Sequence, residues 1–362
     1  RWCCRNFRVS ISFFPCPQYI NARVVRPEGG ELSPGRISRT IRVPPIREIH
    51  MATERTSIHG QWSSRLAFIL AATGSAVGLG NIWKFPYITG EYGGGAFVVV
   101  YLLCIALIGI PIMMAEILLG RRGRASPIMT MKTLAREQGA SSAWSIVGYS
   151  GVVAGFLILS FYSVIAGWAL AYVFQSAGGG LDGVDGAGAE SLFGDLIGSP
   201  GQLLVWHSVF MLMTIGVVAR GVRDGLEKAV MILMPALFVM LLIMVGYAWV
   251  EGDFARGFDF LFNTDFSKVF QLCTGSAEEL QCSFTGEPLL VAMGHAFFTL
   301  SLGMGAIMAY GAYVPDRASI TGATLTIAAT DTVVALLAGL AIFPIVFASG
   351  LEPPGGPGLI LH

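Results

Sequence analysis

The chain has 362 residues, of which 54% are hydrophobic and only 13% are charged, and its formal net charge is zero. Average soluble domains carry about 25% charged residues, so this composition excludes an ordinary water-soluble globule. Its high hydrophobicity excludes an intrinsically disordered chain. The apolar residues lie in long unbroken runs and not in alternating segments of about ten residues, which favours membrane-spanning helices over the strands of a barrel.

The first 50 residues differ from the rest of the chain. They contain nine Arg and three Glu, a net charge of +6, whereas the remaining residues carry a net charge of −6. They have no apolar run, and Met51 then begins a stretch that leads into a hydrophobic helix. We interpret residues 1–50 as a disordered, non-native leader or mis-translated upstream segment, with an Arg-rich transit peptide as the alternative. Residues 51–362 are expected to form the transmembrane domain.

Seven apolar runs of roughly 20 residues predict membrane-spanning helices. They cover residues 65–89, 96–119, 145–174, 203–219, 227–249, 288–313 and 322–349. The loop at 120–144 has five Lys and Arg residues, whereas the loop at 175–202 has four acidic residues and no basic one. The positive-inside rule therefore places the N-terminus and the even-numbered loops in the cytoplasm, as in a multi-pass protein of the cytoplasmic membrane.

The six Cys residues have no metal-ligand spacing. Cys3, Cys4 and Cys16 lie in the first 50 residues, and Cys104 lies in an apolar run, where we expect a buried thiol. Cys273 and Cys282 share one polar loop. They can form a disulfide if that loop faces an oxidising compartment, and two free thiols are the alternative.

The first span contains a segment with low helix propensity. Gly74, Gly78 and Gly80 are followed by Asn81, and each Gly costs about 1 kcal/mol relative to Ala in a helix. Helix packing explains Gly74 and Gly78, but it does not explain Gly80 and Asn81 in the middle of the bilayer. A break there frees backbone groups that lipid cannot satisfy, and such backbone is tolerated only where it lines a cavity or meets a ligand.

The sixth span repeats this pattern at 297–305, where Thr299 and Ser301 precede Gly303 and Gly305. A Gly-kinked helix whose Ser and Thr bond to their own turn is the alternative. Two interrupted spans in corresponding positions of two repeats indicate the binding site of a transporter. Half-helix N-termini offer amides that suit a carboxylate, and the opposite ends offer carbonyls that suit a small cation.

Two polar residues lie within other spans. Asp331 follows Gly322 by nine residues, about 14 Å along a helix, which places it inside the hydrocarbon. An intramembrane carboxylate is a functional hypothesis by default, and an ionised one needs a cation beside it; a protonated Asp bonded to a neighbouring helix is the alternative. Tyr162 lies inside the third span, where its phenol can meet a ligand or belong to an interfacial belt.

Three segments together resemble the neurotransmitter:sodium symporter family, in its prokaryotic leucine-transporter-like branch. They are GLGNIWKFP at 78–86, EYGGGAF at 91–97 and FFTLSLGMG at 297–305. The resemblance implies an all-α integral membrane protein with the leucine-transporter-type inverted-repeat fold. The first five-span repeat is complete, and the second has only spans six and seven. We therefore expect a chain truncated after its seventh span, either as a fragment of a longer product or as an inactive remnant.

The resemblance implies two sodium sites, the second of them incomplete in this chain. The first site, which also touches the substrate carboxylate, would use the Ala76 carbonyl, the Asn81 side chain, Thr299 and Asp331. The second site would use the carbonyls of Gly74 and Val77.

The resemblance also implies the substrate site. The backbone amides of Leu79 and Gly80 and the Tyr162 hydroxyl would hold the substrate carboxylate. Gly78 stands where monoamine carriers of the family have Asp, which favours an amino acid over an amine. The pocket for the substrate side chain would be lined by Ile158, Phe298, Ser301 and Met304, and gating positions match Trp62 and Lys84.

Three residues depart from the family pattern. His59 stands where the family often has a gate Arg, and His295 stands where Gln is common near the chloride site of animal members. Asp331 stands where many members have Asn, so its fixed charge can replace chloride, and we expect chloride independence. The same carboxylate can accept a proton after sodium leaves, which leaves proton counter-transport open.

These residues predict a sodium-coupled symporter of amino acids that works by alternating access. Its partners would be the amino acid, sodium ions and the lipid bilayer, with no nucleic acid, and a homodimer is left open. A non-transporting amino-acid sensor and an inactive remnant are the alternatives. We expect no enzyme, because the seven spans contain no nucleophile–base pair, metal cluster or phosphate loop.

Overall fold

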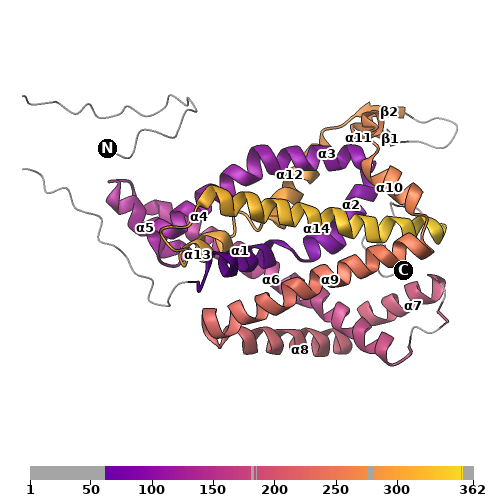
Figure 1. Cartoon of the computed structure of the whole chain (residues 1–362), viewed down its shortest axis with the longest axis horizontal. Helices are drawn as coiled ribbons and strands as arrows, with labels where there is room; N and C mark the ends of the chain where they lie inside the picture. Colours follow the sequence, from indigo (N-terminus) through magenta and orange to yellow (C-terminus); the bar gives the residue numbers. More distant parts are fainter. Residues whose placement is uncertain (1–61, 181–182, 185, 275–280, 352, 354–362) are drawn as a thin grey trace, which may run out of the picture. The chain divides into compact units, whose positions relative to one another are not determined.

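The computed structural model describes residues 62–180, 183–184, 186–274, 281–351 and 353. The expectations for residues 1–50, with Cys3, Cys4 and Cys16, and for His59 lie outside the described residues. Over the described residues the chain is a bundle of helices with one short β-hairpin outside the spans (Figure 1). The predicted all-α class of the membrane domain is confirmed.

The first predicted span is a broken helix. α1 (Arg65–Ala76) begins after Ser64, whose hydroxyl accepts a hydrogen bond from the Ala67 amide and so caps the helix. The chain then unwinds at 77–79 and continues as a π-helical turn, η1 (Gly80–Lys84), and as α2 (Phe85–Glu91). The axes of the two halves differ by 46°, which confirms the interruption predicted from the Gly and Asn residues.

Four continuous spans follow, and each is long and apolar enough to cross a membrane. The second span consists of α3 (Gly95–Cys104), a π-helical turn η2 (Ile105–Gly109) and α4 (Ile110–Gly123). The third is α6 (Ser145–Ala177), the fourth is α8 (Pro200–Val218), and the fifth joins η4 (Val222–Glu227) to α9 (Lys228–Glu251). All four agree with the apolar runs of the sequence.

The sixth predicted span is interrupted as well, and the seventh is not. α12 (Glu287–Thr299) and α13 (Ala306–Gly311) are separated by the unwound residues 300–305. α14 (Ile320–Ala348) is one helix of 29 residues with Asp331 fully buried near its middle. An interrupted span six is therefore followed by a continuous helix that carries a carboxylate.

The loops contain elements that the sequence analysis left as loops. They are α5 (Pro127–Glu137), η3 (Ser142–Trp144), α7 (Gly186–Ile197), α10 (Phe254–Phe262), α11 (Phe266–Val269), β1 (Gln271–Thr274) and β2 (Gln281–Phe284). β1 and β2 pair antiparallel, and their register places Cys273 opposite Cys282 along the backbone. The disulfide between these two residues stays a prediction.

α14 is the central helix of the bundle. It contacts α1, η1, α4, α9 and α10, and in Figure 1 it is the yellow helix that crosses between α3 and α9. Small residues on α14 permit this close packing: a Cβ on Gly339 would lie 3.1 Å from the Leu261 side chain of α10. Because α14 is buried on several sides, Asp331 is held away from lipid.

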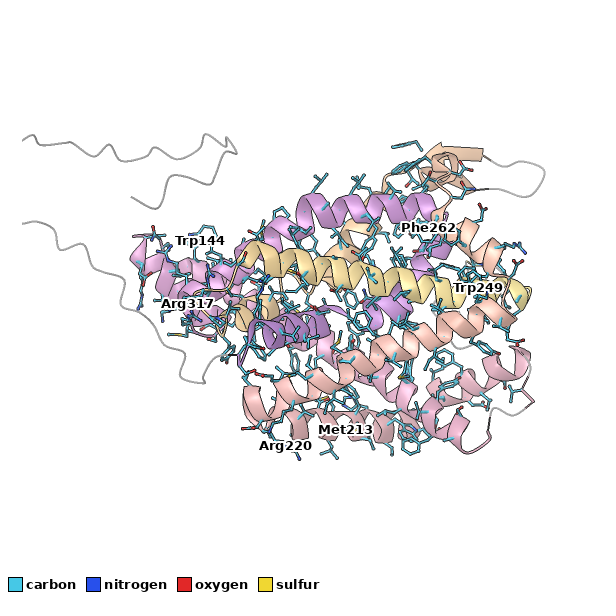
Figure 2. The ribbon with its side chains drawn as sticks, viewed as in Figure 1. Trp144, Met213, Arg220, Trp249, Phe262 and Arg317 are labelled. Carbon is cyan, nitrogen blue, oxygen red and sulfur yellow. The ribbon has the colours of Figure 1, made fainter. Side chains whose placement is uncertain are left out.

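The outer helices present apolar side chains to their surroundings. Met213 on α8 is 57% exposed and Trp249 on α9 is 66% exposed (Figure 2). An apolar exterior is what a membrane-spanning helix requires. Figure 2 also shows Arg220 and Arg317 toward the end of the bundle that holds Trp144, with Trp249 toward the opposite end, in agreement with the asymmetry of basic residues along the loops.

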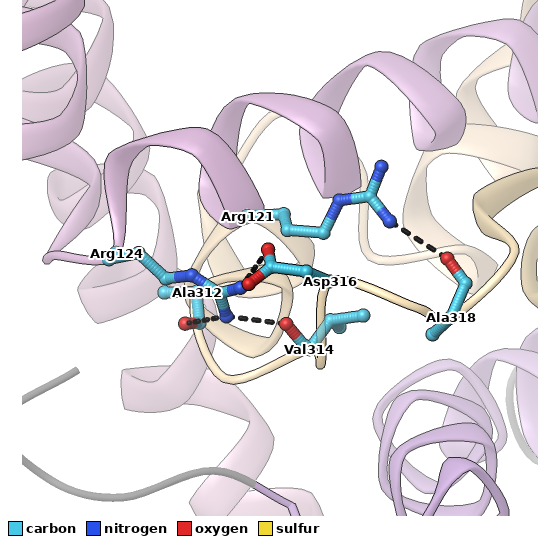
Figure 3. A network of polar contacts seen from close by, with 6 residues as sticks. All are labelled: Arg121, Arg124, Ala312, Val314, Asp316 and Ala318. Carbon is cyan, nitrogen blue, oxygen red and sulfur yellow. Dashed lines mark hydrogen bonds and ion pairs between the residues drawn. The ribbon is translucent and has the colours of Figure 1, made fainter. Parts of the chain in front are cut away.

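An arginine network closes the C-terminal end of α4 (Figure 3). Arg121 donates to the Ala318 carbonyl at 2.8 Å. Arg124 is buried and donates to the carbonyls of Ala312 (3.1 Å) and Val314, and it forms an ion pair with Asp316 at 2.5 Å. Basic side chains at a helix C-terminus interact favourably with the helix dipole and can donate to the last carbonyls. Here they also tie α4 to the segment that follows α13.

Candidate functional site

The interruptions of spans one and six lie directly against each other, and Asp331 of α14 lies beside both. α1 ends at Ala76, and the last carbonyls of an α-helix have no intrahelical partner. The amides freed by the break find side chains instead. The Gly78 amide donates to the Asn81 side-chain oxygen at 3.2 Å, and the Leu79 amide donates to the Tyr162 hydroxyl of α6 at 3.1 Å.

Asp331 is the centre of a buried polar cluster. The Asn81 amide nitrogen donates to its Oδ1 at 2.9 Å and to its backbone carbonyl at 3.0 Å. The Thr299 hydroxyl contacts Oδ1 at 3.0 Å and Oδ2 at 3.1 Å. All three residues are at most 1% exposed. The structure therefore brings together the three side chains predicted for the first sodium site, one from each of spans one, six and seven.

The charge of this cluster has no basic partner. Among the described residues, Asp331 takes part in no ion pair. Burying an ionised carboxylate without a cation is costly. The cluster contains the hydroxyl and carboxylate oxygens that hard cations prefer, and the Asn81 side chain turns its nitrogen toward Asp331 and its oxygen toward the Gly78 amide. The arrangement can hold a small cation, or it can hold a protonated carboxyl that shares its hydrogen bonds with Asn81 and Thr299.

The predicted carbonyl ligands of span one lie close to this cluster in the chain, but their roles stay predictions. Ala76 is the last residue of α1. Gly74 meets α9: a Cβ on it would lie 3.3 Å from the side chains of Met234 and Val230. Val77 packs into an apolar cluster with Met234 and Val334. The close approach of α9 at Gly74 agrees with the helix-packing interpretation, and the role of its carbonyl stays a prediction.

The predicted carboxylate-binding end is tightly built around glycine. A Cβ on Gly78 would overlap the Tyr162 hydroxyl, and a Cβ on Gly80 would lie 3.3 Å from the Phe298 ring. Any side chain at Gly78 would displace the Tyr162 hydroxyl, which accepts a hydrogen bond from the Leu79 amide. Leu79, Gly80 and Tyr162 therefore lie together, as the sequence predicts.

The residues predicted to line the pocket for the substrate side chain have different neighbours in the structure. The unwound backbone at Met304 lies against α6, where a Cβ on Gly151 would be 3.0 Å from the Met304 carbonyl carbon. Ile158 lies one turn before Tyr162 on α6. The Ser301 hydroxyl is used elsewhere, because it donates to the Ser75 carbonyl at 2.8 Å.

The two predicted gating residues contact different halves of span six, Lys84 at α12 and Trp62 at α13. The Lys84 ammonium lies 5.0 Å from the centroid of the Phe298 ring, within cation–π range. Trp62 is 2% exposed, and its indole nitrogen donates to the Tyr310 carbonyl of α13 at 3.2 Å. The next residue, Ser63, donates to the Glu227 carboxylate at the start of span five. The segment before α1 is therefore anchored to two different spans.

Sequence reasoning gave no definite role to two buried residues near the second break. Glu116 of α4 accepts a hydrogen bond from the Gly303 amide at 2.7 Å; a carboxylate inside an apolar run is the signal that marks it. His295 of α12 is fully buried between Tyr101 and Phe85, with ring centroids 5.0 Å and 6.0 Å away. Neither ring nitrogen has a partner among the described residues.

Comparison with known proteins finds that the chain is similar to one family of transporters. A sequence model of the sodium:neurotransmitter symporter family matches residues 59–182. The sodium-dependent transporter YhdH of Bacillus subtilis is 40% identical over 300 residues, which are 83% of this chain and 62% of YhdH. A sodium-dependent transporter of Haemophilus influenzae is 33% identical over 307 residues, 83% of this chain and 64% of the relative.

A solved structure is similar to this chain in both sequence and fold. The crystal structure of MhsT in complex with L-phenylalanine is 46% identical, with a TM-score of 0.74 over 83% of this chain and 64% of MhsT. Over most of its length this chain is similar to members of the sodium:neurotransmitter symporter family. It spans somewhat less than two thirds of the length of these relatives. Its fold and its prokaryotic branch are those predicted from the three sequence segments.

Proposed function

We propose that the protein carries amino acids across the cytoplasmic membrane together with sodium ions, by alternating access. The observation that carries this proposal is the cluster of Asn81, Thr299 and Asp331, which joins both broken spans to one intramembrane carboxylate. A sodium ion there would meet oxygen ligands from three spans, including the Ala76 carbonyl. Gly74 and Val77 would contribute carbonyls to a second sodium ion.

The substrate class follows from the backbone next to this cluster. The amides of Leu79 and Gly80 and the Tyr162 hydroxyl suit a carboxylate, and Gly78 leaves no room for a carboxylate side chain of the protein itself. The substrate would therefore bring its own carboxylate, as an amino acid does. Ile158, Phe298 and Met304 favour a mid-sized apolar or aromatic side chain, which agrees with the phenylalanine bound to MhsT.

Coupling would follow from shared charge. Sodium beside Asp331 attracts the substrate carboxylate, and the carboxylate attracts sodium, so each ligand raises the affinity for the other by the same factor. Trp62 and Lys84 would close the cytoplasmic and outer sides in turn. The N-terminus would lie in the cytoplasm.

Uptake by proteoliposomes tests the proposal. Purified protein is reconstituted, and uptake of tritiated L-phenylalanine and L-leucine is measured with and without an inward sodium gradient. Sodium-driven accumulation supports a symporter. Sodium-dependent binding without accumulation would favour the amino-acid sensor, and the absence of any binding would favour an inactive remnant.

A further inference from the structure

Ser301 has an unusual backbone conformation within the second break. Its φ is 54°, and it is one of two non-glycine residues with positive φ among the described residues. Residues other than glycine seldom adopt this region. The neighbouring positions that need positive φ are Gly303 (80°) and Gly305 (73°). The chain thus uses glycine twice in this turn and a serine once, at the position where the hydroxyl makes a contact that glycine cannot make.

The Ser301 hydroxyl connects the two breaks directly. It donates to the Ser75 carbonyl at 2.8 Å, and Ser301 is 5% exposed. Ser75 lies in the last turn of α1, where carbonyls lack intrahelical partners. An unsatisfied carbonyl in the membrane interior is costly. This bond gives the Ser75 carbonyl of span one a hydrogen-bond donor from span six.

The position of this bond relative to the proposed sodium ligands gives it a mechanical consequence. Ser75 directly precedes Ala76, and Ser301 follows Thr299 by two residues. Asn81 and Thr299 already meet at Asp331. One attachment between two segments lets them pivot, whereas a second attachment fixes their relative orientation. Trp62 attaches the beginning of span one to Tyr310 of α13, and within the two breaks themselves the bond between Ser301 and Ser75 is the second attachment.

We propose that the Ser301 hydroxyl is a positioning group that holds spans one and six in register, so that sodium at the Asp331 cluster raises substrate affinity. This inference rests on the proposed function. Sodium would draw in the Thr299 and Ala76 oxygens, and the Ser301–Ser75 bond would pass that movement to the amides of Leu79 and Gly80.

The test is the factor by which sodium raises the affinity for tritiated L-phenylalanine. Equilibrium binding to purified protein is measured in sodium and in choline chloride, for the wild type and for Ser301→Ala and Ser301→Gly. We expect the factor to fall about 3- to 10-fold in both variants, the range for loss of one neutral hydrogen bond. Ser301→Gly suits the backbone at φ 54°, so it keeps the test valid if Ser301→Ala folds poorly. Ser208→Ala removes a hydroxyl that donates to the Leu204 carbonyl within α8 and is the matched control.

The outcomes are distinct. A lower factor in both variants, with a normal number of binding sites, supports the positioning role. A factor equal to that of the wild type in both variants overturns it, even if stability or the number of sites falls, because that pattern is purely structural. A normal factor in Ser301→Gly with a low one in Ser301→Ala also overturns it, since backbone conformation alone would then be responsible. A wild-type protein whose binding ignores sodium would instead end the proposed function.

Discussion

The substitution Asp331→Asn tests the charge at the centre of the candidate site. Asn keeps one side-chain oxygen for the Asn81 amide, which now donates to Oδ1 at 2.9 Å. It replaces the other oxygen by an amide group that cannot accept from Thr299. Above all it removes the negative charge that would balance a sodium ion in a position fully shielded from water.

The size of the effect follows from the charge. Two unit charges about 4 Å apart interact by about 4 kcal/mol at an effective dielectric constant of about 20. The amide dipole retains part of this, so we expect a loss of about 2–4 kcal/mol, equivalent to about 30- to 700-fold in sodium affinity. The sodium concentration for half-maximal uptake should rise accordingly.

The assay is uptake by proteoliposomes over a range of sodium concentrations, in chloride and in gluconate. The matched control is Asp259→Asn, on the exposed surface of α10, which should behave as the wild type. Because Asp331 supplies a fixed charge, wild-type uptake should not change in gluconate. Wild-type sodium affinity in Asp331→Asn, or loss of wild-type uptake in gluconate, would refute the reasoning.

Three further predictions concern packing and titration. Gly78→Ala should abolish amino-acid binding, because its Cβ would overlap the Tyr162 hydroxyl, while Gly216→Ala, in open space on α8, should bind normally. Gly120→Ala should lower stability by about 1–3 kcal/mol, because its Cβ would overlap the Met308 carbonyl of α13; thermal unfolding in detergent, with Gly216→Ala again as the control, measures this. Burial and the nearby Glu287 carboxylate raise the pKa of Tyr92, at the C-terminal end of α2, from 10.0 to about 12. The neutral phenol should therefore support the fold fully below pH 10 and lose this support as the pH rises to about 12, a loss that Tyr92→Phe should reduce in unfolding titrations.

Much of the membrane architecture could be predicted from the sequence because lipid imposes strict rules. Apolar runs must be helices, so the continuous spans were visible as lengths of hydrophobic sequence. The breaks at Gly80 and Gly303 were visible because helix-breaking residues at mid-bilayer need a special reason. The same rule identified Asp331, since a carboxylate in hydrocarbon demands partners.

The elements outside the bilayer were harder to predict because water satisfies backbone groups in many conformations. α10 did leave a signal: Phe254, Phe258 and Phe262 recur every four residues after Asp253, whose side chain caps the helix. The hairpin of β1 and β2 left a weaker one, because each strand has only four residues. The bond from Ser301 to Ser75 could not be predicted, since it depends on how two distant segments meet.

The polar contacts of the two breaks share one physical origin. In lipid, each backbone group released from a helix needs another partner. Asn81 supplies it for the Gly78 amide, Tyr162 for the Leu79 amide, Glu116 for the Gly303 amide and Ser301 for the Ser75 carbonyl. A ligand that enters such a site exchanges hydrogen bonds that already exist, so hydrogen bonding contributes little net affinity. The uncompensated charge of Asp331 is different, because only a cation or a proton relieves it. Ligand affinity at this site should therefore depend on sodium more strongly than on any single polar contact to the substrate.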